Sequence, residues 1–367
     1  MKRLLSIVRM PFWVANVVVS GLMLLSAYSA ALINPVTHPV WSCIGLLFPL
    51  FLLLECCFLL LWCFTRRRLA LIPLATFTLC YPQIKLYVPI HFATSESSLP
   101  EKNIKLLSYN TMMMSAGRMN DGKNAILEYV KQSDADIVCL QEYVEYRQKG
   151  HLRNSDVNKA LKAYPYRKIV KVGGRSSSNK LACFSKYPIL SAKILPYKSS
   201  YNGSVALRIQ VDGDTLLLIN NHLESNRLNG QDRALYGEML DTPSKQNLQK
   251  AGKTLLTKLG KAASIRARQA DVIAETMRNA CEKYVVVCGD FNDSPLSYAH
   301  RTVAQGMTDA FASTGAGFGI SYNQERLYFR IDHILANSRI KVYNARVDRS
   351  AKGSDHYPIS CRIVLKK

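Results

Sequence analysis

The first hundred residues contain few charges. Only nine Asp, Glu, Lys or Arg side chains occur there, with a net charge of +5. The ten cysteines of the chain include no Cys-x-x-Cys pair, so their spacing gives no zinc site. Five of them fall after residue 100, an odd number that leaves one thiol unpaired under any disulfide scheme. We expect Cys139, Cys288 and Cys361, which lie inside apolar runs, to pack as small hydrophobic residues.

The composition differs sharply between the two parts of the chain. Hydrophobic residues make up 48% and charged residues 20% of the whole, which excludes a disordered or collagen-like protein. Its 367 residues exceed one average domain of roughly 100 to 200. Residues 101–367 carry 41 basic and 24 acidic side chains, a net charge of +17. The chain therefore divides into an apolar head and a basic body.

The head contains three apolar stretches, at residues 12–33, 39–64 and 69–84. The first has no charge in 22 residues, and the second has only Glu55 in 26. Both exceed the roughly 20 residues that a membrane-spanning helix needs. The third is shorter and contains Pro73 and Pro82. We therefore expect a transmembrane anchor at residues 1–92, with two spanning helices and this third candidate.

The positions of the basic residues predict the orientation of these helices. Lys2, Arg3 and Arg9 precede the first stretch, and Arg66–Arg68 separate the second from the third. By the positive-inside rule these residues are cytoplasmic, so the body lies outside the cytoplasm of a multi-pass protein in the cell's inner membrane. Cleavage of the first stretch as a signal peptide, near residues 27–30, would leave the same final topology. Residues 93–102 are polar and contain Pro100, which predicts a linker.

The body alternates short strands and helices. Two helices are predicted, at residues 122–132 and 263–280, and residues 224–261 form a Lys-rich insertion without an obvious strand. Short runs rich in β-branched or aromatic residues and bounded by turn residues predict ten strands, enough for two sheets. These runs are residues 104–109, 136–141, 167–172, 181–185, 205–211, 215–221, 284–289, 327–336, 341–347 and 359–365.

Polar residues follow several of these strands directly. A carboxylate after one strand usually caps a turn, but repeated Asn, Asp, Glu and His at strand ends indicate a shared pocket at one edge of a sheet. The residues are Asn110, Glu142, His222, Asp290, Asn292, Asp332, Asp355 and His356.

The ordered motifs that contain these residues resemble those of the endonuclease/exonuclease/phosphatase superfamily, which is deoxyribonuclease I-like. The motifs are LSYN, LQE, NHLE, GDFN, RIDHIL and SDHYPI, and the resemblance covers residues 103–367, the whole body. The resemblance implies an α/β four-layer sandwich of two β-sheets flanked by helices. It also implies a divalent metal in the cleft, usually Mg²⁺ with Mn²⁺ as the alternative, and hydrolysis of phosphate esters.

Phosphodiester hydrolysis also gives each residue a chemical role. It needs a cation on the phosphate, an oriented water and donors to the phosphoryl oxygens. Glu142 is a hard oxygen ligand suited to Mg²⁺, and Asp355 and Asn110 are further candidates for the metal site. Asp290 is the candidate to position or deprotonate the water. The remaining candidates are donors or orienting groups: Asn110 and Asn292 through their amides, His356 oriented by Asp332, and His222 near the leaving oxygen.

Two neighbouring residues argue against extending the site. His333 follows Asp332 on a strand and so faces the opposite side, which predicts a packing role. Met112 stands where abasic-site endonucleases of the superfamily have Asp, which disfavours a repair endonuclease.

The basic charge of the body bears on the identity of the substrate. The basic body favours nucleic acid as substrate and partner. A lipid phosphodiester beside the bilayer, or an inositol or other small phosphoester, is the alternative. A catalytically silent membrane scaffold is the alternative of another class.

Overall fold

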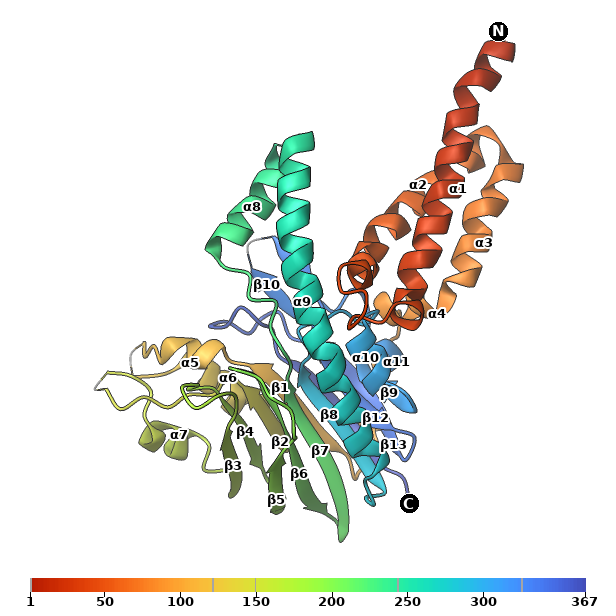
Figure 1. The fold of residues 1–367 in the computed structure, drawn as a ribbon. Helices are drawn as coiled ribbons and strands as arrows, with labels where there is room; N and C mark the ends of the chain where they lie inside the picture. The colour runs from red at the N-terminus through yellow and green to blue at the C-terminus, as the bar shows by residue number, and fades with distance from the viewer. Residues whose placement is uncertain (1, 121, 149, 243, 325) are drawn as a thin grey trace.

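Two six-stranded β-sheets form the centre of the body in the computed structural model, which describes residues 2–120, 122–148, 150–242, 244–324 and 326–367 (Figure 1). Sheet 1 has the order β13-β14-β1-β2-β4-β3, and sheet 2 has the order β5-β6-β7-β8-β12-β9. The strands of sheet 1 are β1 (Ile104–Asn110), β2 (Ile137–Gln141), β3 (Tyr166–Lys171), β4 (Lys180–Ser185), β13 (Ile340–Val347) and β14 (Ile359–Leu365). Those of sheet 2 are β5 (Ile189–Ile194), β6 (Gly203–Val211), β7 (Asp214–His222), β8 (Tyr284–Asp290), β9 (Met307–Asp309) and β12 (Asp332–Asn337).

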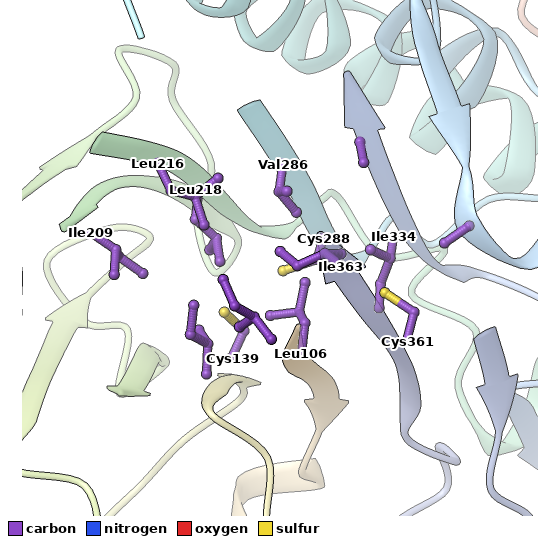
Figure 2. Packing of buried hydrophobic residues seen from close by; sticks show 14 of the residues in the cluster. Leu106, Cys139, Ile209, Leu216, Leu218, Val286, Cys288, Ile334, Cys361 and Ile363 are labelled. Atoms are coloured by element: carbon purple, nitrogen blue, oxygen red, sulfur yellow. The ribbon is translucent and has the colours of Figure 1, made fainter. Parts of the chain in front are cut away.

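The core lies between the two sheets. Side chains alternate along each strand, so Leu106 points into this core while Leu107 packs on the outer face of sheet 1. Figure 2 shows Leu106 and Cys139 of sheet 1 facing Leu218 and Val286 of sheet 2. Cys139, Cys288 and Cys361 all belong to this buried cluster, so they pack as the sequence predicts.

Helices cover the outer face of each sheet. On sheet 1 lie α6 (Ala125–Ser133) and α7 (Asn154–Ala160), and on sheet 2 lie α9 (Lys245–Arg278) and α10 (Tyr298–Val303). The remaining short elements of the body are α5 (Met112–Ala116), α11 (Ala310–Thr314) and the hairpin β10 (Tyr322–Gln324) with β11 (Leu327–Phe329). This arrangement confirms the expected four-layer sandwich.

The head is a bundle of apolar helices. It comprises α1 (Lys2–Leu32), η1 (Trp41–Leu47), α2 (Phe48–Thr65), η2 (Arg67–Ala70), α3 (Leu71–Leu79) and α4 (Tyr81–Tyr87). Two segments, Pro11–Leu32 and Trp41–Thr65, are long and apolar enough to cross a membrane. The third predicted stretch forms two helices bent by 66°, with Pro82 in the first turn of α4. The only charge of the second stretch, Glu55, is buried, where it accepts a 2.7 Å hydrogen bond from Ser20 Oγ.

Head and body share a hydrophobic cluster. Leu296, which follows β8, packs with Met23, Ala27 and Phe48 of the head. A Cβ at Gly45 of η1 would lie 3.4 Å from the carbonyl oxygen of Leu296. The loop after β8 is therefore attached directly to the helices of the head.

Residues 93–102 are fixed to sheet 1 rather than extended as a free linker. They contain η3 (Glu96–Ser98). The backbone N–H of Thr94 donates to Asn344 Oδ1 at 2.7 Å, and Asn344 Nδ2 donates back to the carbonyl of Thr94 at 2.8 Å. Glu96 also pairs with Arg362 of β14 at 2.9 Å. The polar sequence predicted a linker but not these side-chain bonds to distant residues.

The Lys-rich insertion at residues 224–261 is helical. It forms α8 (Gly230–Asp241), capped by Asn229, and the first half of α9, capped by Ser244. The predicted helix at 263–280 therefore begins at Lys245. The predicted strand at 327–336 is two strands, because Ser321 Oγ accepts the backbone N–H groups of Ile331 and Asp332 and interrupts the pairing.

Candidate active site

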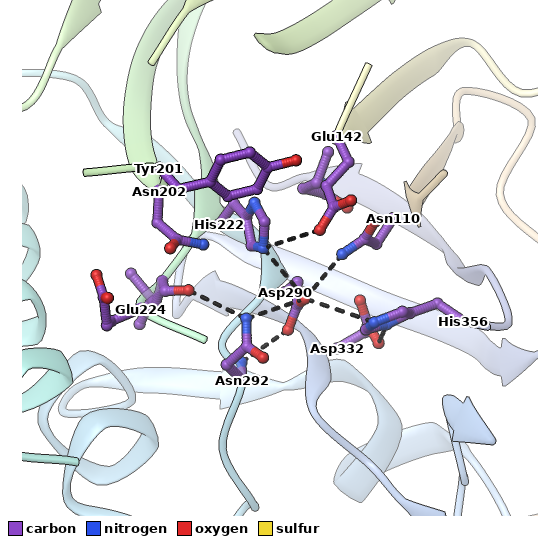
Figure 3. A network of polar contacts seen from close by, with 12 residues as sticks. Asn110, Glu142, Tyr201, Asn202, His222, Glu224, Asp290, Asn292, Asp332 and His356 are labelled. Carbon is purple, nitrogen blue, oxygen red and sulfur yellow. Dashed lines mark hydrogen bonds and ion pairs between the residues drawn. The ribbon is translucent and has the colours of Figure 1, made fainter. Parts of the chain in front are cut away.

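The strand topology brings the predicted polar residues to one edge of the two sheets. In each sheet the central strands are parallel, β1 with β2 and β7 with β8, so their carboxyl ends meet. In sheet 1, Asn110 is the last residue of β1 and Glu142 comes directly after β2. In sheet 2, His222 at the end of β7 and Asp290 at the end of β8 are register partners. β12 runs antiparallel to β8 and therefore begins at this edge, with Asp332 opposite Asp290. Figure 3 shows these side chains converging on Asp290.

Asp290 is the centre of the hydrogen-bond network. Its carboxylate is almost fully buried, at 1% exposure. Oδ2 accepts from Asn110 Nδ2 at 2.9 Å and from Asn292 Nδ2 at 3.2 Å, and Oδ1 accepts from the Asn292 backbone N–H at 2.7 Å. These donors fix the orientation of the carboxylate.

The backbone around Asp290 requires unusual residues. Gly289 has φ 128°, and a Cβ there would lie 2.1 Å from the carbonyl oxygen of Asn221, so only glycine fits between β7 and β8. Glu142, directly after β2, and Asn292, two residues after β8, have left-handed backbones, with φ 53° and 52°. Such strained conformations concentrate at functional sites because they turn a side chain away from the strand direction.

His356 and Asp332 form a buried pair. His356 Nδ1 lies 2.8 Å from Asp332 Oδ2, and because a carboxylate only accepts, Nδ1 carries the proton. The other ring nitrogen, Nε2, lies 3.7 Å from Asp290 Oδ2. Burial alone would lower the pKa of His356, but the carboxylates of Asp332, Asp290 and Asp355 outweigh it and raise this pKa to about 10. His356 is therefore a proton donor near neutral pH.

His222 has the opposite tautomer. Asn179 Nδ2 lies 3.1 Å from His222 Nδ1 and 2.9 Å from the carbonyl of Tyr201, which identifies it as the amide nitrogen. An amide nitrogen only donates, so Nδ1 is the acceptor and Nε2 carries the proton. Nε2 lies 3.6 Å from Glu142 Oε1 and 3.7 Å from Asp290 Oδ2. Burial lowers the pKa of His222, which keeps this ring neutral.

Burial also acts on the two main acids of the site. It raises the pKa of Asp290 to about 6, with Asp332 adding to the effect and His356 opposing it. It raises the pKa of Glu142 as well, against the positive charge of His356. A cation at the site would oppose both shifts, because it favours the ionised carboxylates.

The residues around Glu142 suit a hard divalent cation. Its carboxylate is 21% exposed and interacts with the amide of Asn110 and the charge of Asp355. Carboxylate and amide oxygens with room for water match the preference of Mg²⁺. Among the described residues, Asp290, Asp332 and His356 also bring one ligand atom each within 4.8 Å of one another. His356 and Asp332 are already hydrogen-bonded to each other through the Nδ1 proton of His356. Glu142, Asn110 and Asp355 therefore fit a metal better.

Two supports of the site carry no sequence motif. Asn179 comes directly before β4, and nothing in the neighbouring sequence indicates that it orients His222. Arg266 of α9 is 3% exposed, and it donates to Asp293 Oδ2, the carbonyl of Glu224 and Asn226 Oδ1, each at 2.9 Å. This side chain ties the loop after β7 to the loop after β8.

His333 lies on the other face of sheet 2, as strand alternation predicts. Its ring centroid is 5.1 Å from that of Phe291, and Nε2 donates to the carbonyl of Asp293 at 3.0 Å. It belongs to a buried group with His300 and Asp309. His333 therefore packs behind the site rather than within it.

Comparison with known proteins identifies the family. The Endonuclease/Exonuclease/phosphatase family model matches residues 107–356, more than half of the chain. The chain belongs to this family. The head matches a separate model, Domain of unknown function (DUF8431), over residues 7–87. A search of curated proteins finds no match.

Several solved structures are similar to the body. The human Nocturnin catalytic domain with bound sulfate is 14% identical, with 72% of this chain and 95% of that chain covered and a TM-score of 0.50. An endonuclease/exonuclease/phosphatase from Beutenbergia cavernae is 14% identical, with 72% of each chain covered and a TM-score of 0.49. D. rerio TDP2 complexed with single-strand DNA product is 15% identical, with 72% and 100% covered and a TM-score of 0.48. Nocturnin supports the assignment of the fold.

Proposed function

We propose that the chain is a membrane-anchored, metal-dependent phosphodiesterase. One observation carries the proposal: the buried Asp290 carboxylate is held by Asn110 and Asn292 and lies between the Nε2 atoms of His222 and His356. Amide donors, an acceptor for a water proton and two imidazole donors are the groups that phosphoester hydrolysis requires.

Each residue then has a defined part in the reaction. Asp290 accepts a hydrogen bond, and finally the proton, from the water that attacks phosphorus. His356, protonated and fixed by Asp332, donates to a phosphoryl oxygen and stabilises the charge that develops there. His222, with its proton on Nε2, donates at the same pocket from the opposite side of Asp290. Asn292 keeps the Asp290 carboxylate from rotating, since it binds both carboxylate oxygens.

Glu142, with Asn110 and Asp355, would hold the divalent cation, Mg²⁺ first and Mn²⁺ as the alternative. The bound cation supplies positive charge to the phosphate and its leaving oxygen. The raised pKa of Glu142 supports this assignment, because a buried carboxylate without a cation is disfavoured.

The two long apolar helices support anchoring in a membrane. With Arg66–Arg68 on the cytoplasmic side and the third apolar stretch crossing the membrane again, the proposed topology places the body outside the cytoplasm of the inner membrane.

Two substrate classes follow from different observations. The net charge of +17 on residues 101–367 favours nucleic acid, which stays our first substrate hypothesis. The attachment of Leu296 to the head favours a lipid phosphoester, because it keeps the loop that carries Asn292 close to the bilayer. Inositol and other small phosphoesters are further candidates for the same chemistry.

Hydrolysis of bis(p-nitrophenyl) phosphate by the full chain in detergent, with and without Mg²⁺, tests the activity. We expect metal-dependent release of p-nitrophenol that Asp290→Asn removes. A properly folded chain without this activity would instead be a silent scaffold at the membrane. A panel of DNA, RNA, phospholipid, sphingomyelin and inositol phosphates then ranks the substrates.

A further inference from the structure

Three titratable side chains that the proposed reaction does not use lie together on the outer face of sheet 2. They are His300 of α10, Asp309 at the end of β9 and His333 of β12, and each is at most 8% exposed. His300 Nε2 lies 2.9 Å from Asp309 Oδ2, and His333 Nδ1 lies 3.9 Å from the same oxygen. One ligand atom from each residue lies within 4.8 Å of the other two.

The proton of His333 is on the side of its ring that faces away from Asp309. Because a carbonyl only accepts, Nε2 donates to the carbonyl of Asp293 at 3.0 Å. Burial lowers the pKa of His333 well below its usual value, and His300 adds to the effect, so the ring is neutral and Nδ1 is an acceptor. This buried nitrogen has no hydrogen-bond partner within the described part of the chain. Two acceptors, Nδ1 and the Asp309 carboxylate, therefore lie close together in a place that suits a cation.

Asp309 is ionised in this cluster. Burial raises its pKa, but His300 and Arg330 outweigh burial and hold the pKa below its usual range. Oδ1 accepts the backbone N–H of Ala312 at 2.9 Å, which leaves Oδ2 for the two rings. Arg330 contributes its charge, while its guanidinium donates to the carbonyl of Leu86 in the head. The cluster thus offers one anionic oxygen and two imidazole nitrogens.

This set of ligand atoms matches zinc. Zn²⁺ takes nitrogen and oxygen ligands in a tetrahedron, and three protein ligands with one water are a common set. Bonds of about 2.0 to 2.1 Å place tetrahedral ligand atoms about 3.3 Å apart. The two distances to Asp309 Oδ2, 2.9 and 3.9 Å, lie on either side of that separation. A metal-bound imidazole usually donates its other N–H to a carbonyl or carboxylate, as His333 does to Asp293.

A cavity between the head and the body reaches the cluster. Its volume is about 780 Å³, and it is lined by His300 and Asp309 together with Ala27 and Ala31 of α1 and Pro82 of α4. The cavity gives a metal ion a path of entry and leaves room for a water as the fourth ligand.

We propose that His300, Asp309 and His333 bind one Zn²⁺, at a site separate from the Mg²⁺ site proposed at Glu142. The bound metal joins α10, β9 and β12 on the outer face of sheet 2. Through the bond from His333 to Asp293 it also holds the loop after β8, which carries Asn292. Its role is structural, and it does not depend on the proposed function, because none of its ligands takes part in that reaction.

The test is the binding of one equivalent of Zn²⁺ to the full chain in detergent, after a chelator has removed all metals. We expect one Zn²⁺ per chain by elemental mass spectrometry, and the visible absorption of four-coordinate Co²⁺ when Co²⁺ replaces it. His333→Gln and Asp309→Asn should each weaken Zn²⁺ binding roughly 100-fold or more, since loss of a group that only supports a ligand already costs up to this much. His151→Gln, a histidine outside the cluster, should bind Zn²⁺ like the unchanged chain.

Circular dichroism checks that each variant is folded, and Asp309→Asn, which keeps the shape of its side chain, decides the matter if His333→Gln is not. A folded unchanged chain that binds no Zn²⁺ would overturn the proposal. Zinc that is lost in His356→Gln and retained in Asp309→Asn would also overturn it, because the metal would then lie at the group of Asp290, Asp332 and His356.

Discussion

Asp290 Oδ2 is equally distant, at 3.7 Å, from Nε2 of His222 and Nε2 of His356. The two rings differ in charge, because the pKa of His222 is lowered by burial while that of His356 is raised by its carboxylate neighbours. A base therefore lies between one neutral and one charged donor. This asymmetry underlies the prediction for Asp332 below.

The roles of Glu142 and Asp290 separate in metal titrations of activity. Glu142→Gln removes a charged ligand and should raise the Mg²⁺ concentration needed for half activity, with partial recovery at high metal. Asp290→Asn retains shape but not basicity, so a loss of roughly 10²-fold or more should persist at saturating metal. Rescue of Asp290→Asn by Mg²⁺, with none for Glu142→Gln, would reverse the assignments.

The alkaline limit of activity should depend on Asp332. In the proposed mechanism activity requires protonated His356, whose pKa is raised to about 10 by its carboxylate neighbours, so the rate should fall at alkaline pH as this ring loses its proton. Asp332→Asn removes a carboxylate that stabilises the protonated ring, which lowers this pKa and moves the alkaline limb to lower pH. Asp348→Asn, a carboxylate that instead bonds Tyr129, is the control. An unchanged alkaline limb in Asp332→Asn would contradict the role of His356.

Arg266→Met should destabilise the body by about 3 kcal/mol, since it leaves the Asp293 carboxylate, whose side chain is only 11% exposed, without its partner. The measurement is the midpoint of thermal inactivation of the full chain in detergent. Arg268→Met on the exposed face of the same helix should change this midpoint little. Equal effects of the two substitutions would show that Arg266 does not support the site.

A fragment from Asn103 should fold alone, since its strands and motifs are complete, and one from Pro89 should be more stable. The longer fragment keeps the two Thr94–Asn344 bonds and the bond from Gly317 N–H to the carbonyl of Pro89. Each is worth about 1 kcal/mol, or roughly 2 to 4 °C in Tm. Circular dichroism during heating measures both. An insoluble or unfolded Asn103 fragment would contradict the predicted domain boundary.

Membrane orientation is tested with a reporter that is active only outside the cytoplasm, fused after Lys367 in a bacterial host. Because Arg66–Arg68 resist export and the third apolar stretch then carries the body across the membrane, we expect this fusion to be active. Activity of a cytoplasmic reporter at the same position would reverse the proposed topology.

Local sequence predicted the strands that carry the site, because their β-branched runs end at Asn, Asp, Glu or His in a recognisable order. It did not predict β5, whose residues are partly exposed at the edge of sheet 2. It also missed the first half of α9, whose narrow apolar stripe packs on α8 rather than on a sheet. Asn179 and Arg266 act through partners more than 20 residues away, and no pattern in a single sequence records such contacts.

The position of Leu296 restricts how this protein can be rebuilt. It is six residues after Asp290 and belongs to the core of the head, so the short segment between Asp290 and Leu296 is held at both ends. An exchange of residues 1–92 for an unrelated anchor would remove the packing partners of that loop. We therefore expect the head to support the loop of the candidate site structurally, which an interchangeable tether would not do, and chimeras should be joined within the head, not at residue 93.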